Sequence, residues 1–196
     1  MKSSYLRAGA ALACALALSA CGGSDGELGL GGSFSGVTKP GLVLQNNGGS
    51  DLAIPPTATG TGRFFFTELM ETDSDYNVTV KSIPSNAEKC ETFNNTGRVA
   101  FTISNVGIVC TIKTHALTGT VSGLTGNNLV LVNGADRIPV AAGATTFAMS
   151  RVNEDAPYGV AVLTQPDNQT CTVANGSGVM GANDVANVAV TCVNRT

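Results

Sequence analysis

The chain has 196 residues, a formal net charge of −3, no tryptophan and one histidine. It contains no basic cluster, so length, composition and charge argue against a nucleic-acid-binding protein. Glycine is frequent, with 24 residues, and threonine, valine and asparagine are abundant, which is typical of turn-rich β structure. Apolar residues do not recur at the helical period after residue 21. We therefore expect an all-β fold.

The first residues have the parts of a secretory signal. Lys2 and Arg7 form a short positive region, and 8–18 is an almost uninterrupted run of alanine and leucine. Eleven apolar residues are too few to span a bilayer as a helix, which requires roughly 20. The run is followed by Leu18-Ser19-Ala20-Cys21, with small residues leading up to the cysteine. We expect residues 1–20 to be removed as a signal peptide.

The tetrapeptide Leu18-Ser19-Ala20-Cys21 resembles the lipobox of bacterial lipoproteins. In that family the cysteine receives a diacylglycerol and usually a further acyl chain such as palmitate, and it becomes the first residue of the mature chain. The resemblance implies lipidation of Cys21 and a lipid-anchored protein of the cell envelope. Gly22 after the cysteine favours the outer membrane, on either the periplasmic or the surface face. The alternative is an ordinary secretory signal with Cys21 as a plain thiol.

A glycine- and serine-rich segment follows the cysteine. We expect 21–35 to form a lipidated, flexible tether, because its composition provides little apolar surface to bury. Loss of Lys2 and Arg7 would reduce the 11 basic residues to nine against 14 acidic ones. Electrostatic binding to anionic membrane lipids is therefore not expected.

The remainder of the chain contains an internal repeat of about 80 residues. We place repeat one at 36–113 and repeat two at 117–196, joined by a few residues around His115. The matching segments are Leu42-Val43-Leu44 with Leu129-Val130-Leu131, Tyr76-Asn77-Val78-Thr79-Val80 with Tyr158-Gly159-Val160-Ala161-Val162, and Asn105-Val106-Gly107-Ile108-Val109-Cys110 with Asn187-Val188-Ala189-Val190-Thr191-Cys192.

Repeat two shows strand patterns at short, regular spacing. Seven strands are predicted, at 118–124, 128–132, 137–141, 145–149, 158–164, 169–174 and 185–193. Asn133-Gly134 lies between two of them and predicts a hairpin in which both residues take the positive φ of a type I′ turn. Tyr158, Val160 and Val162 alternate onto one face. Seven short antiparallel strands predict a small β-sandwich.

The Tyr-x-Val-x-Val strand, at 76–80 and 158–162, resembles the tyrosine-corner strand of fibronectin type III and related immunoglobulin-like (Ig-like) domains. The wider pattern, with Gln-Thr-Cys-Thr-Val at 169–173 and Asn-Val-x-Val-Thr-Cys at 187–192, is similar to tandem repeats in Gram-negative surface proteins. The resemblance implies two tandem Ig-like β-sandwiches. It implies architecture more than activity.

Four cysteines remain in the mature chain after Cys21, two in each repeat. Four cysteines allow three pairings, and the repeat favours pairing within each domain because each module should fold alone. In an oxidising compartment we expect the disulfides Cys90–Cys110 and Cys171–Cys192. Each would close a loop of about 20 residues and stabilise its domain by roughly 3 kcal/mol. A zinc site is the rival interpretation, and the spacing of the cysteines disfavours it.

Residue patterns for catalysis are weak. His115 falls in the link between the repeats, where a solvated side chain is favoured over a general base. The acidic stretch Glu71–Asp75 and its counterpart Asn153–Asp155 could offer oxygen ligands to Ca²⁺, but solvated loops are favoured. We predict no catalytic residue, no metal ligand and no cofactor, and expect neither a nucleic-acid partner nor a small-molecule substrate.

The sequence favours a non-enzymatic, membrane-anchored envelope lipoprotein that acts as a structural spacer or an adhesin-like, protein-binding module. The alternative is an accessory subunit of an envelope secretion or assembly machine, in which an exposed sheet edge pairs with a partner strand. A periplasmic hydrolase is a third and much weaker hypothesis, since acid–base pairs are scarce.

Overall fold

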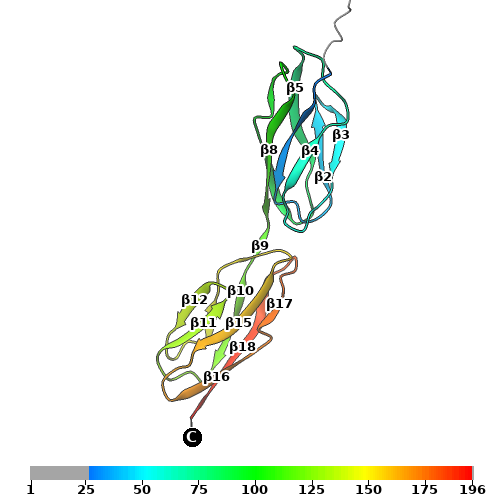
Figure 1. Ribbon diagram of the computed structural model, residues 1–196. Coiled ribbons are helices and arrows are strands. Elements are labelled where there is room, and N and C mark those ends of the chain that lie inside the picture. Colours follow the sequence, from blue (N-terminus) through cyan, green and yellow to red (C-terminus); the bar gives the residue numbers. More distant parts are fainter. Residues whose placement is uncertain (1–26, 196) are drawn as a thin grey trace, which may run out of the picture.

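The computed structural model describes residues 27–195, and every regular element in that range is a β-strand. Two β-sandwiches follow one another along the chain and lie end to end (Figure 1). Within the described residues, no helix is long and apolar enough to cross a membrane. The all-β expectation and the two tandem sandwiches are confirmed.

Repeat one consists of two four-stranded sheets. One sheet has the order β4-β1-β8-β6 and the other the order β3-β2-β5-β7. The strands are β1 (Leu30–Ser35), β2 (Leu42–Asn46), β3 (Gly49–Ile54), β4 (Gly62–Phe65), β5 (Asp75–Ser82), β6 (Ala87–Phe93), β7 (Thr96–Arg98) and β8 (Ile103–Ile112). β1 pairs parallel to β8, whereas its other neighbour β4 is antiparallel.

Repeat two has the same topology. Its sheets are β13-β10-β18-β16 and β12-β11-β15-β17. The strands are β10 (Leu117–Ser122), β11 (Leu129–Asn133), β12 (Asp136–Val140), β13 (Thr146–Ala148), β15 (Pro157–Thr164), β16 (Gln169–Ala174), β17 (Ser177–Val179) and β18 (Val185–Asn194). A short pair, β9 (Thr114–His115) with β14 (Val152–Asn153), lies where the repeats meet.

Each sandwich buries its own core. In repeat one, Leu42 and Leu44 on β2 face Val106 and Ile108 on β8 across the sandwich, all at most 1% exposed. A separate cluster at the same strand positions forms the core of repeat two. Alternating apolar residues produce these faces because successive side chains of a strand point to opposite sides. The two clusters share no residue, so each repeat has a core of its own.

The predicted tether, 21–35, includes residues that belong to the folded domain. Leu30–Ser35 is not flexible but forms β1, between β4 and β8, and Leu30 and Phe34 are buried in the core. Glycine lets this strand lie close to its neighbour: a Cβ on Gly32 would stand 1.8 Å from the carbonyl oxygen of Val106. The glycine content that suggested disorder is therefore a packing requirement. The remaining tether residues, up to 26, lie outside the described part.

Two local predictions for repeat two also need correction. Repeat two forms eight main strands and not seven, because Ser177–Val179 pairs with β15 as the additional strand β17. The predicted hairpin forms, but Asn133 pairs with Asp136, so the turn residues are Gly134 and Ala135 and only Gly134 has a positive φ. The type I′ signature occurs instead at Asn47-Gly48 of repeat one, where both φ values are positive.

Candidate functional site

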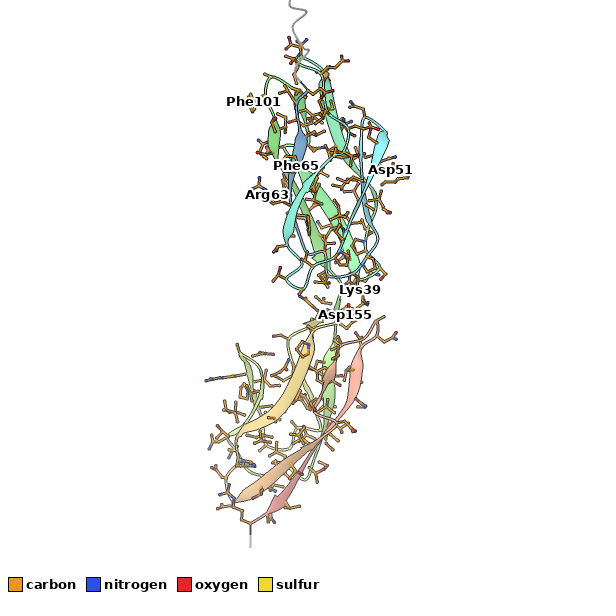
Figure 2. All side chains as sticks on the ribbon, turned by 45° about the vertical axis from the view of Figure 1, so that its right-hand side comes forward. Lys39, Asp51, Arg63, Phe65, Phe101 and Asp155 are labelled. Atoms are coloured by element: carbon orange, nitrogen blue, oxygen red, sulfur yellow. A yellow bond between two sulfur atoms is a disulfide. The ribbon has the colours of Figure 1, made fainter. Side chains whose placement is uncertain are left out.

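The junction between the repeats brings His115 and the acidic segment Asn153–Asp155 together with polar residues of repeat one. The acidic segment Asn153–Asp155 lies at the end of repeat two that faces repeat one. Lys39, from the segment after β1, reaches it from repeat one, and Figure 2 shows Lys39 and Asp155 meeting between the two sandwiches. We call the set Lys39, Asn86, His115, Glu154 and Asp155 the junction cluster.

Lys39 connects the two repeats by charge. Its Nζ lies 3.0 Å from Oδ2 of Asp155 and 3.4 Å from Oε1 of Glu154. The hydrogen bond to Asp155 raises the pKa of Lys39 above its ordinary value, aided by the two negative charges and opposed by desolvation. The ammonium group is therefore held charged at the junction. Because both Lys39 and Asp155 remain partly exposed, salt weakens this contact.

Glu154 is not the solvated residue that the sequence favoured. It is 8% exposed, since repeat one covers the end of repeat two at this point. Its two carboxylate oxygens are divided between partners: Oε1 faces Lys39, and Oε2 lies 3.4 Å from Nε2 of His115. The His115 side chain is itself only 15% exposed, which corrects the expectation of a solvated linker histidine. A carboxylate this buried requires such partners to offset lost hydration.

Asn86 completes the contact from the repeat-one side. It is fully buried, and its Nδ2 donates to Oγ1 of Thr38 at 2.9 Å and to Oδ2 of Asp155 at 3.1 Å. Its backbone oxygen accepts a hydrogen bond from the Lys113 amide, and the Lys113 oxygen in turn accepts one from the Glu154 amide. The linker is thus hydrogen-bonded to both repeats. Among the described residues, Oδ1 of Asn86 has no hydrogen-bond partner.

Sequence reasoning missed Lys39 and Asn86. They contact residues 115 and 69 positions away along the chain, and no local pattern distinguishes them from other polar loop residues. What the assembled cluster can do follows from its composition. Its ion pairs and hydrogen bonds join residues of one sandwich to residues of the other.

The second acidic segment, Glu71–Asp75, lies at the opposite end of repeat one from the junction and is exposed for the most part, as expected. Asp73 pairs with Arg98 at 3.6 Å, and the Asp73 carbonyl also accepts a hydrogen bond from the Arg98 Nε. In residues 27–195, no three acidic, histidine or cysteine side chains are arranged as a metal site.

Both expected disulfides are present. Cys90 is bonded to Cys110, and Cys171 to Cys192. Each bridge joins directly opposite residues on neighbouring strands of one sheet, β6 with β8 and β16 with β18. They therefore fasten the strand that ends each repeat rather than linking the two sheets. Cys21, the predicted lipidation site, lies outside the described residues.

No family model matches the sequence, and no curated protein matches it. Solved structures with a related arrangement include fragments of a pilus adhesin and of a collagen-binding protein. The Bacillus anthracis TIE protein matches at 11% identity with a TM-score of 0.45, over 85% of this chain and 34% of that one. A C-terminal fragment of the pilus adhesin SpaC from Lactobacillus rhamnosus GG matches at 11% identity with a TM-score of 0.41, over 86% and 98%.

Two B repeat units of the collagen-binding protein of Staphylococcus aureus match at 16% identity with a TM-score of 0.26, over 86% of this chain and 50% of that one. This chain thus spans about a third of the TIE protein and half of the collagen-binding fragment. All identities are low and the TM-scores are below 0.5. The fold is therefore established by the strand pairing itself.

Proposed function

We propose that this protein is a non-enzymatic lipoprotein of the bacterial cell envelope, anchored through Cys21, whose two sandwiches form a stiff spacer or an adhesin-like, protein-binding module. The lipobox at Leu18-Ser19-Ala20-Cys21 supports the anchor, and its Gly22 supports the outer membrane. The observation that carries the mechanical part of the proposal is the junction cluster. It holds two domains end to end, the arrangement a spacer requires.

The linker itself supports stiffness. β8 ends at Ile112, β9 occupies Thr114–His115 and β10 begins at Leu117, so one residue separates each successive pair of strands. β9 is not free, because it pairs with β14 of repeat two. A flexible linker needs several residues without hydrogen bonds. Bending at this junction would break the Lys113 and Asn86 contacts described above.

Stiffness can be measured by small-angle X-ray scattering on the mature chain. We expect the wild-type profile to fit one elongated particle, and a Lys39→Met, Asp155→Asn double variant to need a broader set of shapes. A Lys81→Met, Asp51→Asn double variant is the matched control, because it removes a comparable exposed ion pair on repeat one. A wild-type profile as broad as that of the junction variant would contradict a stiff spacer.

The anchor has a separate test. Cells expressing wild-type protein should incorporate radioactive palmitate into it, and cells expressing Cys21→Ala should not. Label in both proteins would refute lipidation at Cys21. Intact-mass measurement of the mature protein provides a second readout, since cleavage before Cys21 and acylation each change the mass by a defined amount.

A further inference from the structure

The end of repeat one from which the chain runs back to Cys21 carries exposed apolar side chains. Leu69 is 52% exposed and Phe101 is 69% exposed. Phe65 is 47% exposed, and a Cβ on Gly29 would lie 3.7 Å from its Cδ1 and 3.3 Å from Cγ2 of Thr102, the residue after Phe101. Large apolar side chains gathered at one end of a small domain indicate a contact surface. We call Phe65, Leu69 and Phe101 the apolar end.

Backbone pairing fixes the apolar end around the first described residues. Leu28 exchanges two hydrogen bonds with Met70, at 2.9 and 2.8 Å, which places Leu69 beside the start of the folded chain. On the other side, the Ile103 amide donates to the Gly29 oxygen at 2.8 Å, and the Gly29 amide donates to Oγ1 of Thr102 at 3.3 Å. Phe101 is therefore held on the opposite flank of the same segment.

Repeat two provides an internal comparison. Its equivalent end faces repeat one, a protein surface, and there the position before the bridging residue is Arg151 instead of Leu69. The loop that corresponds to the one carrying Phe101 is Gly181-Ala182-Asn183-Asp184, and the counterpart of Phe65 is Ala148. At these three positions the end that meets protein has a polar or small residue, whereas the end directed toward Cys21 has a large apolar one.

Chain length determines what the apolar end can reach. Six positions separate Cys21 from Glu27, and at no more than ~3.6 Å per residue they span about 20 Å. Because Leu30–Ser35 is a strand, far less chain separates Cys21 from the folded domain than a tether reaching residue 35 would provide. If Cys21 carries the lipid, as the proposed function holds, the apolar end lies within that distance of the bilayer.

We propose that the apolar end docks onto the membrane surface as a second attachment, with Leu69 and Phe101 inserted among the lipid headgroups. This rests on the proposed lipid anchor. Apolar and aromatic side chains at such a boundary bury their surface to a depth of ~5–10 Å. Glu68 and Glu71 flank Leu69, so the docking surface matches a zwitterionic membrane better than an anionic one. Docking holds the two sandwiches at a fixed angle to the bilayer.

Because the chain contains no tryptophan, one introduced indole reports on one position. The lipidated full chain with Phe101→Trp is reconstituted into phosphatidylcholine vesicles containing brominated acyl chains, which quench indole fluorescence on contact. The matched control is Ala182→Trp, in the equivalent loop of repeat two. We expect at least about twofold quenching for the first protein, as for an indole at interfacial depth, and none for the control. Leu69→Ser in the Phe101→Trp background should reduce the quenching.

The outcomes separate the two proposals. An intact mass without acyl chains at Cys21 refutes the lipid anchor and the docking with it. If the protein is lipidated but neither indole is quenched more than the other, docking is refuted and the lipid anchor is not. Blue-shifted emission from Trp at position 101 without bromolipid quenching places the apolar end against protein, such as a second copy, and also overturns the proposal. Both positions are exposed, so neither indole disturbs a core.

Discussion

Gln169 provides the sharpest test of how repeat two is held together. The side chain is 3% exposed and makes four hydrogen bonds. Its Oε1 accepts from the amides of Thr125 and Gly126, both at 2.8 Å. Its Nε2 donates to the Gly123 carbonyl at 2.8 Å and to Oδ1 of Asn194 at 3.1 Å. One amide thus fastens the loop after β10 to the end of β18.

We expect Gln169→Ala to destabilise repeat two by about 3 kcal/mol. Four hydrogen bonds at a net ~0.5–1.5 kcal/mol each give roughly 4 kcal/mol. In the variant, water can reach the partly exposed loop and satisfy some of the groups left behind, which lowers this cost. For a domain of about 80 residues, ~4–8 °C per kcal/mol implies a fall in Tm of about 10–25 °C. Calorimetry on the mature chain, with hydrogen exchange of peptides from each repeat, assigns the shift to its domain.

Gln45→Ala is the control, because Gln45 lies in repeat one and makes a single side-chain bond, to Asp51. It should leave the repeat-two transition unchanged. Gln169→Glu refines the test: it keeps an acceptor for the two amides but turns an oxygen toward the Gly123 carbonyl. The variant should therefore gain stability as the new carboxyl is protonated at low pH. A repeat-two Tm within a few degrees of wild type in Gln169→Ala would refute this account.

Three further outcomes follow from the structure. Gly123→Ala should lower the unfolding free energy by more than the ~1–2 kcal/mol of a left-handed backbone alone, since φ is +72° and a Cβ would lie 2.3 Å from the Cys192 oxygen. Gly143 also has a positive φ, +78°, but open space around it. Gly143→Ala should therefore lose only the backbone part, measured in the same denaturant titration. Replacing both cysteines of the repeat-two disulfide by alanine should lower that repeat's unfolding free energy by roughly 3 kcal/mol and leave repeat one unchanged. The hydrogen bond from Lys81 lowers the pKa of Asp51. The stability that this carboxylate contributes is therefore fully present above its unfolded pKa of about 3.9 and is lost as the pH falls through the lowered folded value. The Tm difference between wild type and Asp51→Asn should shrink over that range.

Much of the architecture is readable from the repeat. The offset of 87 that aligns Leu42 with Leu129 also aligns Leu30 with Leu117 and Gly32 with Gly119. Extending that comparison backward would have revealed β1, which composition alone disguised as a tether. β17 is harder to foresee, because its three exposed residues carry no apolar alternation. Pairing with β15 determines it, and that pairing is a contact between distant segments.

Local alternation and the comparison of one repeat with the other predict most of the strands, the two repeats and the cysteine pairing. The junction cluster and the apolar end, by contrast, follow from contacts between distant segments. Lys39 meets Asp155, and Leu69 flanks the same segment as Phe101, because strand pairing brings together residues far apart in the chain. Burial of Glu154 is likewise a property of how two domains meet, and no pattern within either repeat encodes it.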